Sequence, residues 1–216
     1  MKTDFSLEAV ILDLGGVVFA ISVDQIIKSW AKSAGCHPED IAPKFKVDEY
    51  YKLFEMGKIS PEEYRSHVCN VLGIKISDED FDEGWNSIYL DLLPGIESLL
   101  LQLKGKTRLI VLTNTNEIHA KEWRIRYADI LRHFDKVFAS HEIGSRKPSP
   151  ESFNAILDYL GTTPDKVVFF DDTPDNVEGA LSIGISSFVV NSPCEVSEKL
   201  KLIGIEIDLN NGLIGG

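Results

Sequence analysis

A run of apolar residues that ends abruptly in an aspartate is the feature of this sequence that most constrains its fold. Residues 9–12 are Ala-Val-Ile-Leu, Asp13 follows, and Gly15 and Gly16 come directly after. Four apolar residues without polar alternation are typical of a strand buried on both faces of a sheet, and the glycines predict an immediate turn. A carboxylate inside such a strand would be costly to bury. We therefore expect Asp13 at the carboxyl end of the strand, where open α/β sheets bind their ligands.

Two further stretches of the sequence have the same shape. Residues 108–112 form a mainly apolar run that ends in Thr113 and Asn114, and residues 167–170 form one that ends in Asp171 and Asp172. If these strands are parallel neighbours, their carboxyl ends meet at one edge of the sheet. The sequence therefore predicts carboxylate, hydroxyl and amide groups together at that edge, without a histidine base.

Strand and helix patterns alternate along the second half of the chain. Strands are expected at residues 9–12, 108–112, 136–139, 166–170 and 186–190, and helices at 95–103, 117–127, 150–160 and 176–183. Such alternation is typical of an α/β fold, here a doubly wound parallel sheet with helices on both faces. Residues 196–202 predict a last helix, and residues 204–216 are expected to form a loose tail.

Residues 20–90 interrupt the alternation with a block in which we expect helices and no strand. One helix start is marked by Ser60, Pro61 and Glu63, which match a capping serine, a first-turn proline and a third-position glutamate. Because the block directly follows the first strand, we expect it to lie above the polar edge of the sheet as a cap. The predicted organisation is a core domain, residues 1–19 and 91–216, with a helical cap domain, residues 20–90.

The charge and cysteine content argue against several functional classes. A formal net charge of −12 without any basic run argues against nucleic-acid binding. The three cysteines have no paired spacing, which fits a reduced compartment, and no apolar stretch reaches membrane-spanning length. The five histidines lack paired metal-ligand spacing, and we interpret them as surface or core residues. We expect a cytoplasmic protein, a monomer or weak homodimer, that acts on a small-molecule substrate.

Four short motifs occur in order along the chain. They are Asp13-Leu14-Gly15-Gly16-Val17, then Thr113 after its strand, then Arg146-Lys147-Pro148, and finally Asp171-Asp172 followed by Asn176. Together they resemble the four motifs of the haloacid dehalogenase superfamily of hydrolases, and the resemblance extends over about residues 9–190. It implies a Rossmann-like core, and the acidic fourth motif favours a phosphatase, which acts on a small phosphorylated substrate.

The resemblance implies roles for the residues that touch the phosphate. Asp13 would be the nucleophile, which attacks phosphorus and forms an aspartyl phosphate. Lys147 would be catalytic as well as substrate-binding, because it neutralises both the nucleophile and the transferred group. Thr113, through its hydroxyl, and Asn114, through its backbone amide, would bind phosphoryl oxygens.

The resemblance also implies a Mg²⁺ cofactor between the nucleophile and the phosphate, because two anions must meet in the reaction. Mg²⁺ is a hard cation that prefers oxygen ligands. The expected protein ligands are Asp13, the backbone carbonyl of Gly15, and Asp172 with Asp171. Asn176 is expected to orient the acidic pair.

Gly15 departs from the usual first motif, in which a second aspartate protonates the leaving group and then activates water. Loss of a general acid-base typically costs about 10² to 10⁴ in rate, and a leaving group such as an anomeric sugar oxygen needs it less. The residues of these motifs are similar to those of a bacterial subgroup that includes an α-glucose-1-phosphate phosphatase. This resemblance implies a sugar phosphate as substrate.

Two alternatives to a phosphatase follow from the same residues. Gly15 would also fit a non-catalytic relative that binds a phosphorylated ligand or a protein partner. A 2-haloacid dehalogenase would use the same scaffold, but that class usually lacks the acidic pair, which this chain keeps as Asp171 and Asp172.

Overall fold

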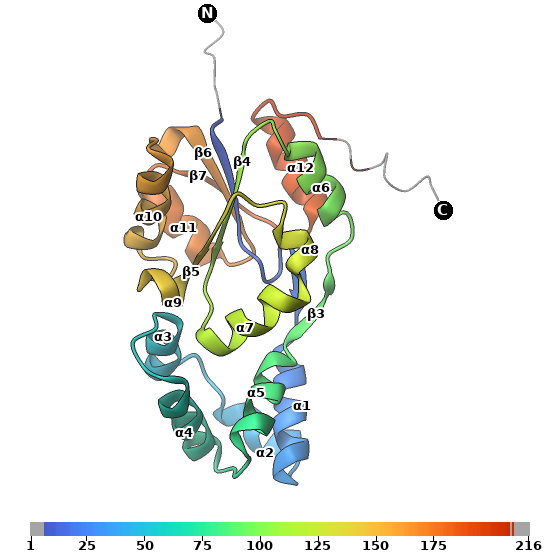
Figure 1. The fold of residues 1–216 in the computed structure, drawn as a ribbon, viewed down its shortest axis with the longest axis vertical. Helices are drawn as coiled ribbons and strands as arrows, with labels where there is room; N and C mark the ends of the chain where they lie inside the picture. Colours follow the sequence, from blue (N-terminus) through green and yellow to red (C-terminus); the bar gives the residue numbers. More distant parts are fainter. Residues whose placement is uncertain (1–6, 208, 210–216) are drawn as a thin grey trace, which may run out of the picture.

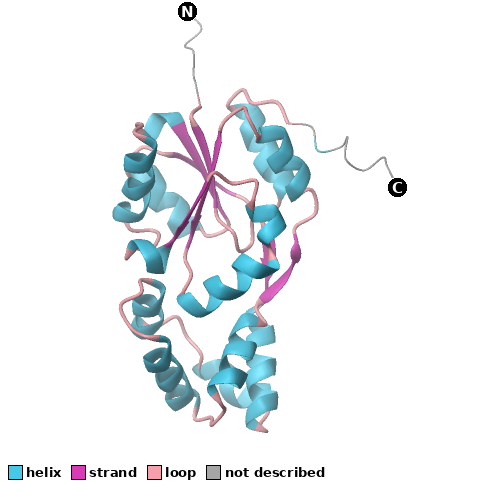
Figure 2. Ribbon diagram, in the orientation of Figure 1, coloured by secondary structure: helices cyan, strands magenta, loops and turns pink. Residues whose placement is uncertain are grey.

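A parallel sheet of five strands forms the centre of the molecule (Figures 1 and 2). The computed structural model describes residues 7–207 and 209 of the 216. The strand order is β5-β4-β1-β6-β7, and the neighbouring strands are parallel. The strands are β1 (Ala9–Leu12), β4 (Arg108–Thr113), β5 (Lys136–Ala139), β6 (Val167–Asp171) and β7 (Ser186–Val189). The predicted α/β fold is confirmed.

Strand β1 lies in the middle of the sheet and is closed to water. All of its residues are fully buried, and Leu12 lies opposite Val111 of β4 and Phe170 of β6. Burial on both faces explains why residues 9–12 are apolar without alternation. Because the sheet extends from β1 in both directions, the carboxyl end of β1 lies at the centre of the polar edge.

Helices cover both faces of the sheet (Figure 1). Leu100 packs with Val10 in the apolar cluster on one face, and Ile156 packs with Ile11 in the cluster on the other. The first face carries α6 (Ile96–Leu103), α7 (Glu117–Arg126), α8 (Ala128–Leu131) and α12 (Pro193–Leu202). The second carries α9 (Ser140–Ile143), α10 (Pro150–Leu160) and α11 (Pro174–Ser182), with the short turn η2 (Pro164–Lys166) before β6.

A second group of helices lies at one end of the molecule, in the lower part of Figure 1. It comprises α1 (Val23–Ala34), α2 (Pro38–Ile41), η1 (Ala42–Lys44), α3 (Glu49–Glu55), α4 (Pro61–Leu72) and α5 (Asp78–Asn86). These helices share an apolar cluster of their own, in which the Trp30 and Trp85 rings stack with centroids 5.5 Å apart. The predicted start of α4 is confirmed, because Ser60 Oγ accepts from the Glu63 amide and Glu63 accepts from the Ser60 amide.

The expectation that residues 20–90 contain no strand is wrong. Strands β2 (Phe19–Ile21) and β3 (Tyr89–Leu92) form an antiparallel pair where the chain passes between the sheet and the helical group. Each strand is very short, and its partner lies on the other side of the whole helical group in sequence. Neither therefore shows the local alternation by which a strand is predicted. The pairing joins the segment that enters the helical group to the segment that leaves it.

Several predicted element ends shift by a few residues. Helix α7 ends at Arg126, one residue before its predicted end at residue 127. Helices α11 and α12 begin earlier than predicted, with Pro174 and Pro193 in their first turns. Ile207 of the predicted loose tail is buried against the core, while residues 208 and 210–216 lie outside the described residues. None of the helices within the described ranges has the length and hydropathy to cross a bilayer.

Candidate active site

Three carboxylates from distant parts of the sequence meet at the polar edge of the sheet. Asp13 follows β1, Asp171 ends β6, and Asp172 comes next. Each offers one oxygen, and the three oxygens lie within 4.8 Å of one another. We call these three residues the acidic cluster. They meet because parallel neighbouring strands end at the same edge, as the sequence predicts.

Lys147 lies inside the acidic cluster rather than in solvent. It is 1% exposed, and its ammonium lies 2.8 Å from Asp13 Oδ1 and 2.5 Å from Asp171 Oδ2. It also donates to the Leu112 carbonyl at 2.9 Å. Burial alone would lower the pKa of Lys147, but the charges of Asp13 and Asp171 outweigh burial and raise it. Lys147 is therefore a fixed positive charge.

Asn114 holds Lys147 in place through a pair of hydrogen bonds. The Asn114 side chain accepts from the Lys147 amide at 2.8 Å and donates to the Lys147 carbonyl at 3.0 Å. The sequence suggested a use for the backbone amide of Asn114 but not this one for its side chain. Thr113, at the end of β4, is nearly buried and lies beside Asn114 in the lining of a cavity.

The two aspartates at the end of β6 have different surroundings. Asp171 is fully buried, and its Oδ1 accepts from the Thr173 amide and from Asn176 Nδ2, both at 2.9 Å. Asn176 thus makes the orienting contact that was expected of it. Asp172 is half-buried and accepts from the Thr173 hydroxyl at 3.1 Å. Asp172 therefore has the freer carboxylate of the two.

Gly15 and Gly16, which follow Asp13, differ in how well they would tolerate a side chain. Gly16 has a φ of 77°, and a Cβ on it would lie 2.2 Å from Asp172 Oδ2. Any side chain there would displace that carboxylate. A Cβ on Gly15 would lie 3.2 Å from Ile21 Cδ1, the end of a side chain that can shift. Gly15 lines the same cavity as Asp13 and Asp172.

The acidic cluster has an excess of negative charge. Burial raises the pKa of Asp13 to about 7, against the lowering effect of Lys147, and burial together with Asp171 raises the pKa of Asp172. When ionised, the three carboxylates and Lys147 have a net charge of −2. A divalent cation would neutralise this charge, and carboxylate oxygens are the ligands that Mg²⁺ prefers. The residues present therefore fit a magnesium site.

A cavity of about 270 Å³ opens over the acidic cluster. Its floor contains Asp13, Gly15, Thr113, Asn114, Lys147 and Asp172. Its other walls come from β2, β3, α3 and α7, including Tyr51 and Glu55 of α3, and from Arg146 beside Lys147. Nothing in the spacing of Tyr51, Glu55 and Arg146 marked them as neighbours, because they converge only in the folded chain.

His119 is the histidine that lines this cavity, and its surroundings keep it neutral. It is buried, its ring stacks on Trp85 with centroids 4.5 Å apart, and its Nδ1 lies 3.1 Å from Asn86 Oδ1. Burial lowers the pKa of His119 to about 3. At neutral pH the imidazole is therefore uncharged and is not a proton donor of the kind that an imidazolium provides.

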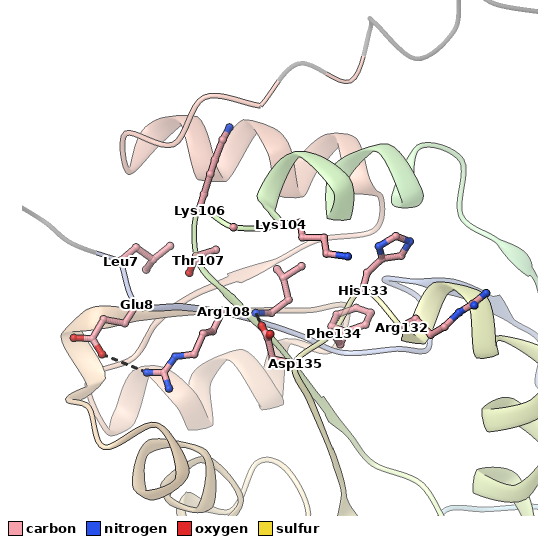
Figure 3. Close-up of a pocket in the computed structure, with 12 residues that line it drawn as sticks. Leu7, Glu8, Lys104, Lys106, Thr107, Arg108, Arg132, His133, Phe134 and Asp135 are labelled. Carbon is pink, nitrogen blue, oxygen red and sulfur yellow. Dashed lines mark hydrogen bonds and ion pairs between the residues drawn. The ribbon is translucent and has the colours of Figure 1, made fainter.

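A larger cavity, of about 480 Å³, lies at the opposite edge of the sheet, where β4 begins (Figure 3). Basic side chains line it, but Arg108 pairs with Glu8 at 3.6 Å and Lys106 donates to the Glu206 carbonyl at 3.4 Å. It contains no member of the acidic cluster. The candidate active site is therefore the smaller cavity.

Comparison with known proteins identifies a family that matches this chain and phosphatases that are similar to it. A family model described as haloacid dehalogenase-like hydrolase matches residues 7–184. A D-ribitol-5-phosphate phosphatase of Bacteroides thetaiotaomicron is 21% identical over 202 residues, which are 91% of this chain and 98% of that protein. A phosphorylated carbohydrates phosphatase of Thermotoga maritima is 29% identical over 187 residues, 83% of this chain and 82% of that protein.

A solved structure of similar fold contains bound magnesium and phosphate. It is a haloacid dehalogenase family enzyme from Bacteroides thetaiotaomicron in complex with magnesium and inorganic phosphate. It superposes with a TM-score of 0.75 at 31% sequence identity and covers 86% of this chain and 95% of its own. The similarity therefore extends over the sheet and the helical group together.

Proposed function

This chain belongs to the haloacid dehalogenase-like hydrolases and is a phosphatase, and from that premise we propose that it hydrolyses monoesters of small phosphorylated metabolites with Mg²⁺. One observation carries the proposal. Asp13 lies 2.8 Å from the Lys147 ammonium, with ligand atoms of Asp171 and Asp172 within 4.8 Å. A carboxylate beside both a fixed cation and a metal site is suited to attack a phosphate, because the attack brings two anions together.

The proposed reaction has two steps. An Asp13 oxygen attacks phosphorus, the bond from phosphorus to the leaving oxygen breaks, and an aspartyl phosphate forms. The leaving alkoxide takes a proton from water and departs as an alcohol. Water then attacks that phosphorus and the bond between phosphorus and the Asp13 oxygen breaks, which releases inorganic phosphate and restores the Asp13 carboxylate. The Thr113 hydroxyl and the Asn114 backbone amide bind phosphoryl oxygens, and Lys147 stabilises the charge that develops on them. When bound, Mg²⁺ would supply the remaining neutralisation between carboxylate and phosphate.

The proposed Mg²⁺ ligands are Asp13, the backbone carbonyl of Gly15, and Asp172, with Asp171 assisting. Asp171 already accepts hydrogen bonds from Thr173, Asn176 and Lys147. Asp172, which has fewer partners, is the better placed of the two to coordinate a metal ion. The missing Cβ of Gly16 leaves Asp172 the room to do so.

Mg²⁺ is expected to raise the melting temperature more at pH 8 than at pH 5.5. The pKa of Asp13 is about 7 in the folded protein and 3.8 in the reference state. The folded metal-free protein therefore holds a proton that the unfolded chain releases, and its stability falls as pH rises through this interval. Mg²⁺ competes with that proton, so its stabilising effect should grow with pH.

The measurement is thermal unfolding with Mg²⁺ or with a chelator, at both pH values. An Asp172→Asn variant is the matched control, because it keeps the shape of the site and should show a smaller Mg²⁺ effect at either pH. Equal shifts at the two pH values, or equal shifts in the variant, would contradict the assignment.

Gly15→Asp is expected to speed hydrolysis of alkyl phosphates by about tenfold or more, with a smaller gain for p-nitrophenyl phosphate. An acid there can protonate an alkoxide, whereas nitrophenolate leaves with little help. The new Cβ is tolerable, since it meets the movable end of the Ile21 side chain. Steady-state kinetics on both esters test this, with Gly15→Asn as the control that adds bulk without acidity. Slower hydrolysis of both esters by Gly15→Asp would show that another group supplies the proton.

The proposed organisation keeps the chemistry and the substrate selection apart. Residues 1–19 and 91–216 form the core domain that holds the phosphate, and residues 20–90 form the cap that contacts the leaving group. The named phosphatases of D-ribitol-5-phosphate and phosphorylated carbohydrates among the relatives support a sugar or polyol phosphate as substrate. We further propose that the protein acts as a monomer or weak homodimer in the cytoplasm.

A screen of phosphorylated metabolites tests the function directly. Phosphate release is measured from hexose, pentose and polyol phosphates, each with Mg²⁺ and with a chelator. Release that depends on Mg²⁺ and favours one of these classes supports the proposal. No release from any ester would instead favour a relative that only binds phosphorylated ligands.

A further inference from the structure

Three polar side chains form one wall of the active-site cavity. Tyr51 and Glu55 come from α3, and Arg146 comes from the loop that also carries Lys147. Arg146 Nε donates to Glu55 Oε2 at 2.7 Å, and the Tyr51 hydroxyl also hydrogen-bonds to Glu55. We call these three residues the polar wall. It links the helical group to the loop that holds the fixed cation of the site.

Glu55 is unusual because it is a buried acid in a cavity that would receive a phosphate. It is 4% exposed, and among the described residues lining this cavity it is the one carboxyl outside the acidic cluster. Burial raises the pKa of Glu55, and the adjacent Arg146 opposes that effect. The ion pair has no net charge, so it neither attracts nor repels a phosphate strongly. Its contribution to a ligand is therefore hydrogen bonding.

The polar wall keeps unused hydrogen-bonding capacity. Within the described part of the chain, Glu55 is the one side chain that hydrogen-bonds to the Arg146 guanidinium, through Nε. The rest of its five N–H donors remain available. A carboxylate has about four acceptor positions, and Arg146 and Tyr51 occupy two of those on Glu55. Free donors and free acceptors therefore lie side by side, the pattern that complements two adjacent hydroxyl groups.

The polar wall also lies where a leaving group would be. Phosphoryl transfer places the attacking and leaving oxygens roughly in line, so the leaving group departs on the side of phosphorus opposite Asp13. Asp13 lies on the cavity floor at the sheet edge, and α3 belongs to the helical group beyond it (Figure 1). Because Arg146 directly precedes Lys147, the wall is fixed relative to the phosphate position.

We propose that Glu55 and Arg146, supported by Tyr51, bind adjacent hydroxyl groups of the leaving group and so select polyhydroxylated phosphate esters over esters with apolar leaving groups. The inference rests on the proposed phosphatase function. It assigns Glu55 as the acceptor of hydroxyl protons and Arg146 as the donor to hydroxyl oxygens. An apolar leaving group would leave the remaining donors of Arg146 and the remaining acceptors of the buried Glu55 without partners, which disfavours such a substrate.

The test compares two esters that differ in adjacent hydroxyls and little else. Glycerol 3-phosphate has a vicinal diol, and propyl phosphate has the same carbon chain without it. The diol preference is the ratio of their kcat/KM values, measured with Mg²⁺ for the wild type, Glu55→Gln and Arg146→Lys. We expect the wild type to prefer the diol by tenfold or more, and each variant to lose most of that preference. Arg146→Lys keeps a charge beside Glu55, so it decides the matter if Glu55→Gln does not fold.

The control is Glu142→Gln, which breaks an Arg124–Glu142 ion pair of 2.8 Å that is half-exposed and lies outside this cavity. It should keep the wild-type diol preference. The proposal is overturned if the wild type has no diol preference, if Glu55→Gln and Arg146→Lys keep it, or if they slow both esters equally. Hydrolysis of p-nitrophenyl phosphate by the wild type separates these outcomes from failure of the phosphatase function, which would abolish activity on every ester.

Discussion

Asp13→Asn is expected to reduce Mg²⁺-dependent phosphatase turnover by at least about 10⁴-fold while the protein remains folded. An amide oxygen is a far weaker nucleophile than a carboxylate, and the variant cannot form the aspartyl phosphate. The geometry of the site should survive, because asparagine has the same shape. Removing one of three close carboxylates also relieves repulsion in the metal-free protein, so its melting temperature should not fall.

Two measurements check this expectation. Turnover is followed with p-nitrophenyl phosphate under saturating Mg²⁺, and thermal unfolding is followed with a chelator present. Asp129→Asn is the control, since the Asp129 side chain is 91% exposed and is not part of the acidic cluster. Turnover within a few-fold of wild type in Asp13→Asn would refute a covalent mechanism on this residue.

Lys147→Met is expected to lower the free energy of unfolding by about 3–5 kcal/mol and to abolish turnover. The ammonium pairs with Asp13 and Asp171, both buried, so its removal leaves two carboxylates without their cation. The same loss removes the positive charge that would face the transferred phosphate. Urea unfolding in the presence of a chelator gives the stability change free of any compensation by Mg²⁺.

A second substitution separates this electrostatic cause from a packing effect. Adding Asp171→Asn to Lys147→Met removes one of the stranded charges, so the double variant should be more stable than the sum of the single effects predicts. Lys121→Met is the matched control, because Lys121 pairs with Glu117 at the surface. Its loss should change the free energy of unfolding by less than about 1 kcal/mol. Strict additivity of Lys147→Met and Asp171→Asn would mean that the ion pair contributes little.

The sheet and its acidic cluster could be predicted because their signals are local in sequence. Each of the strands β1, β4 and β6 is an apolar run that stops at a polar residue, and parallel pairing alone then brings Asp13, Thr113 and Asp171 together. For Lys147, a position at this edge follows only from the resemblance to a known motif, since its loop has no periodic pattern. Its burial between two carboxylates is a property of the folded chain.

Contacts between distant segments could not be predicted in the same way. Strands β2 and β3 pair across the whole helical group, and Glu55 meets Arg146 across 91 residues. Nothing in the sequence near Glu55 distinguishes it from the solvated acids of other helices. The side chain of Asn114 is a similar case, because its bonds to Lys147 depend on how two loops approach each other.

Those two bonds also bear on how such a protein can acquire new substrates. Because the Asn114 amide joins the loop after β4 to the loop of Lys147, the groups proposed to hold the phosphate are held together by two hydrogen bonds that involve no residue of α1–α5. Random substitution confined to residues 47–55 would therefore alter which alcohols are accepted while the hydrolytic machinery stays constant. A library built on those positions is the most direct route to redirecting this catalyst.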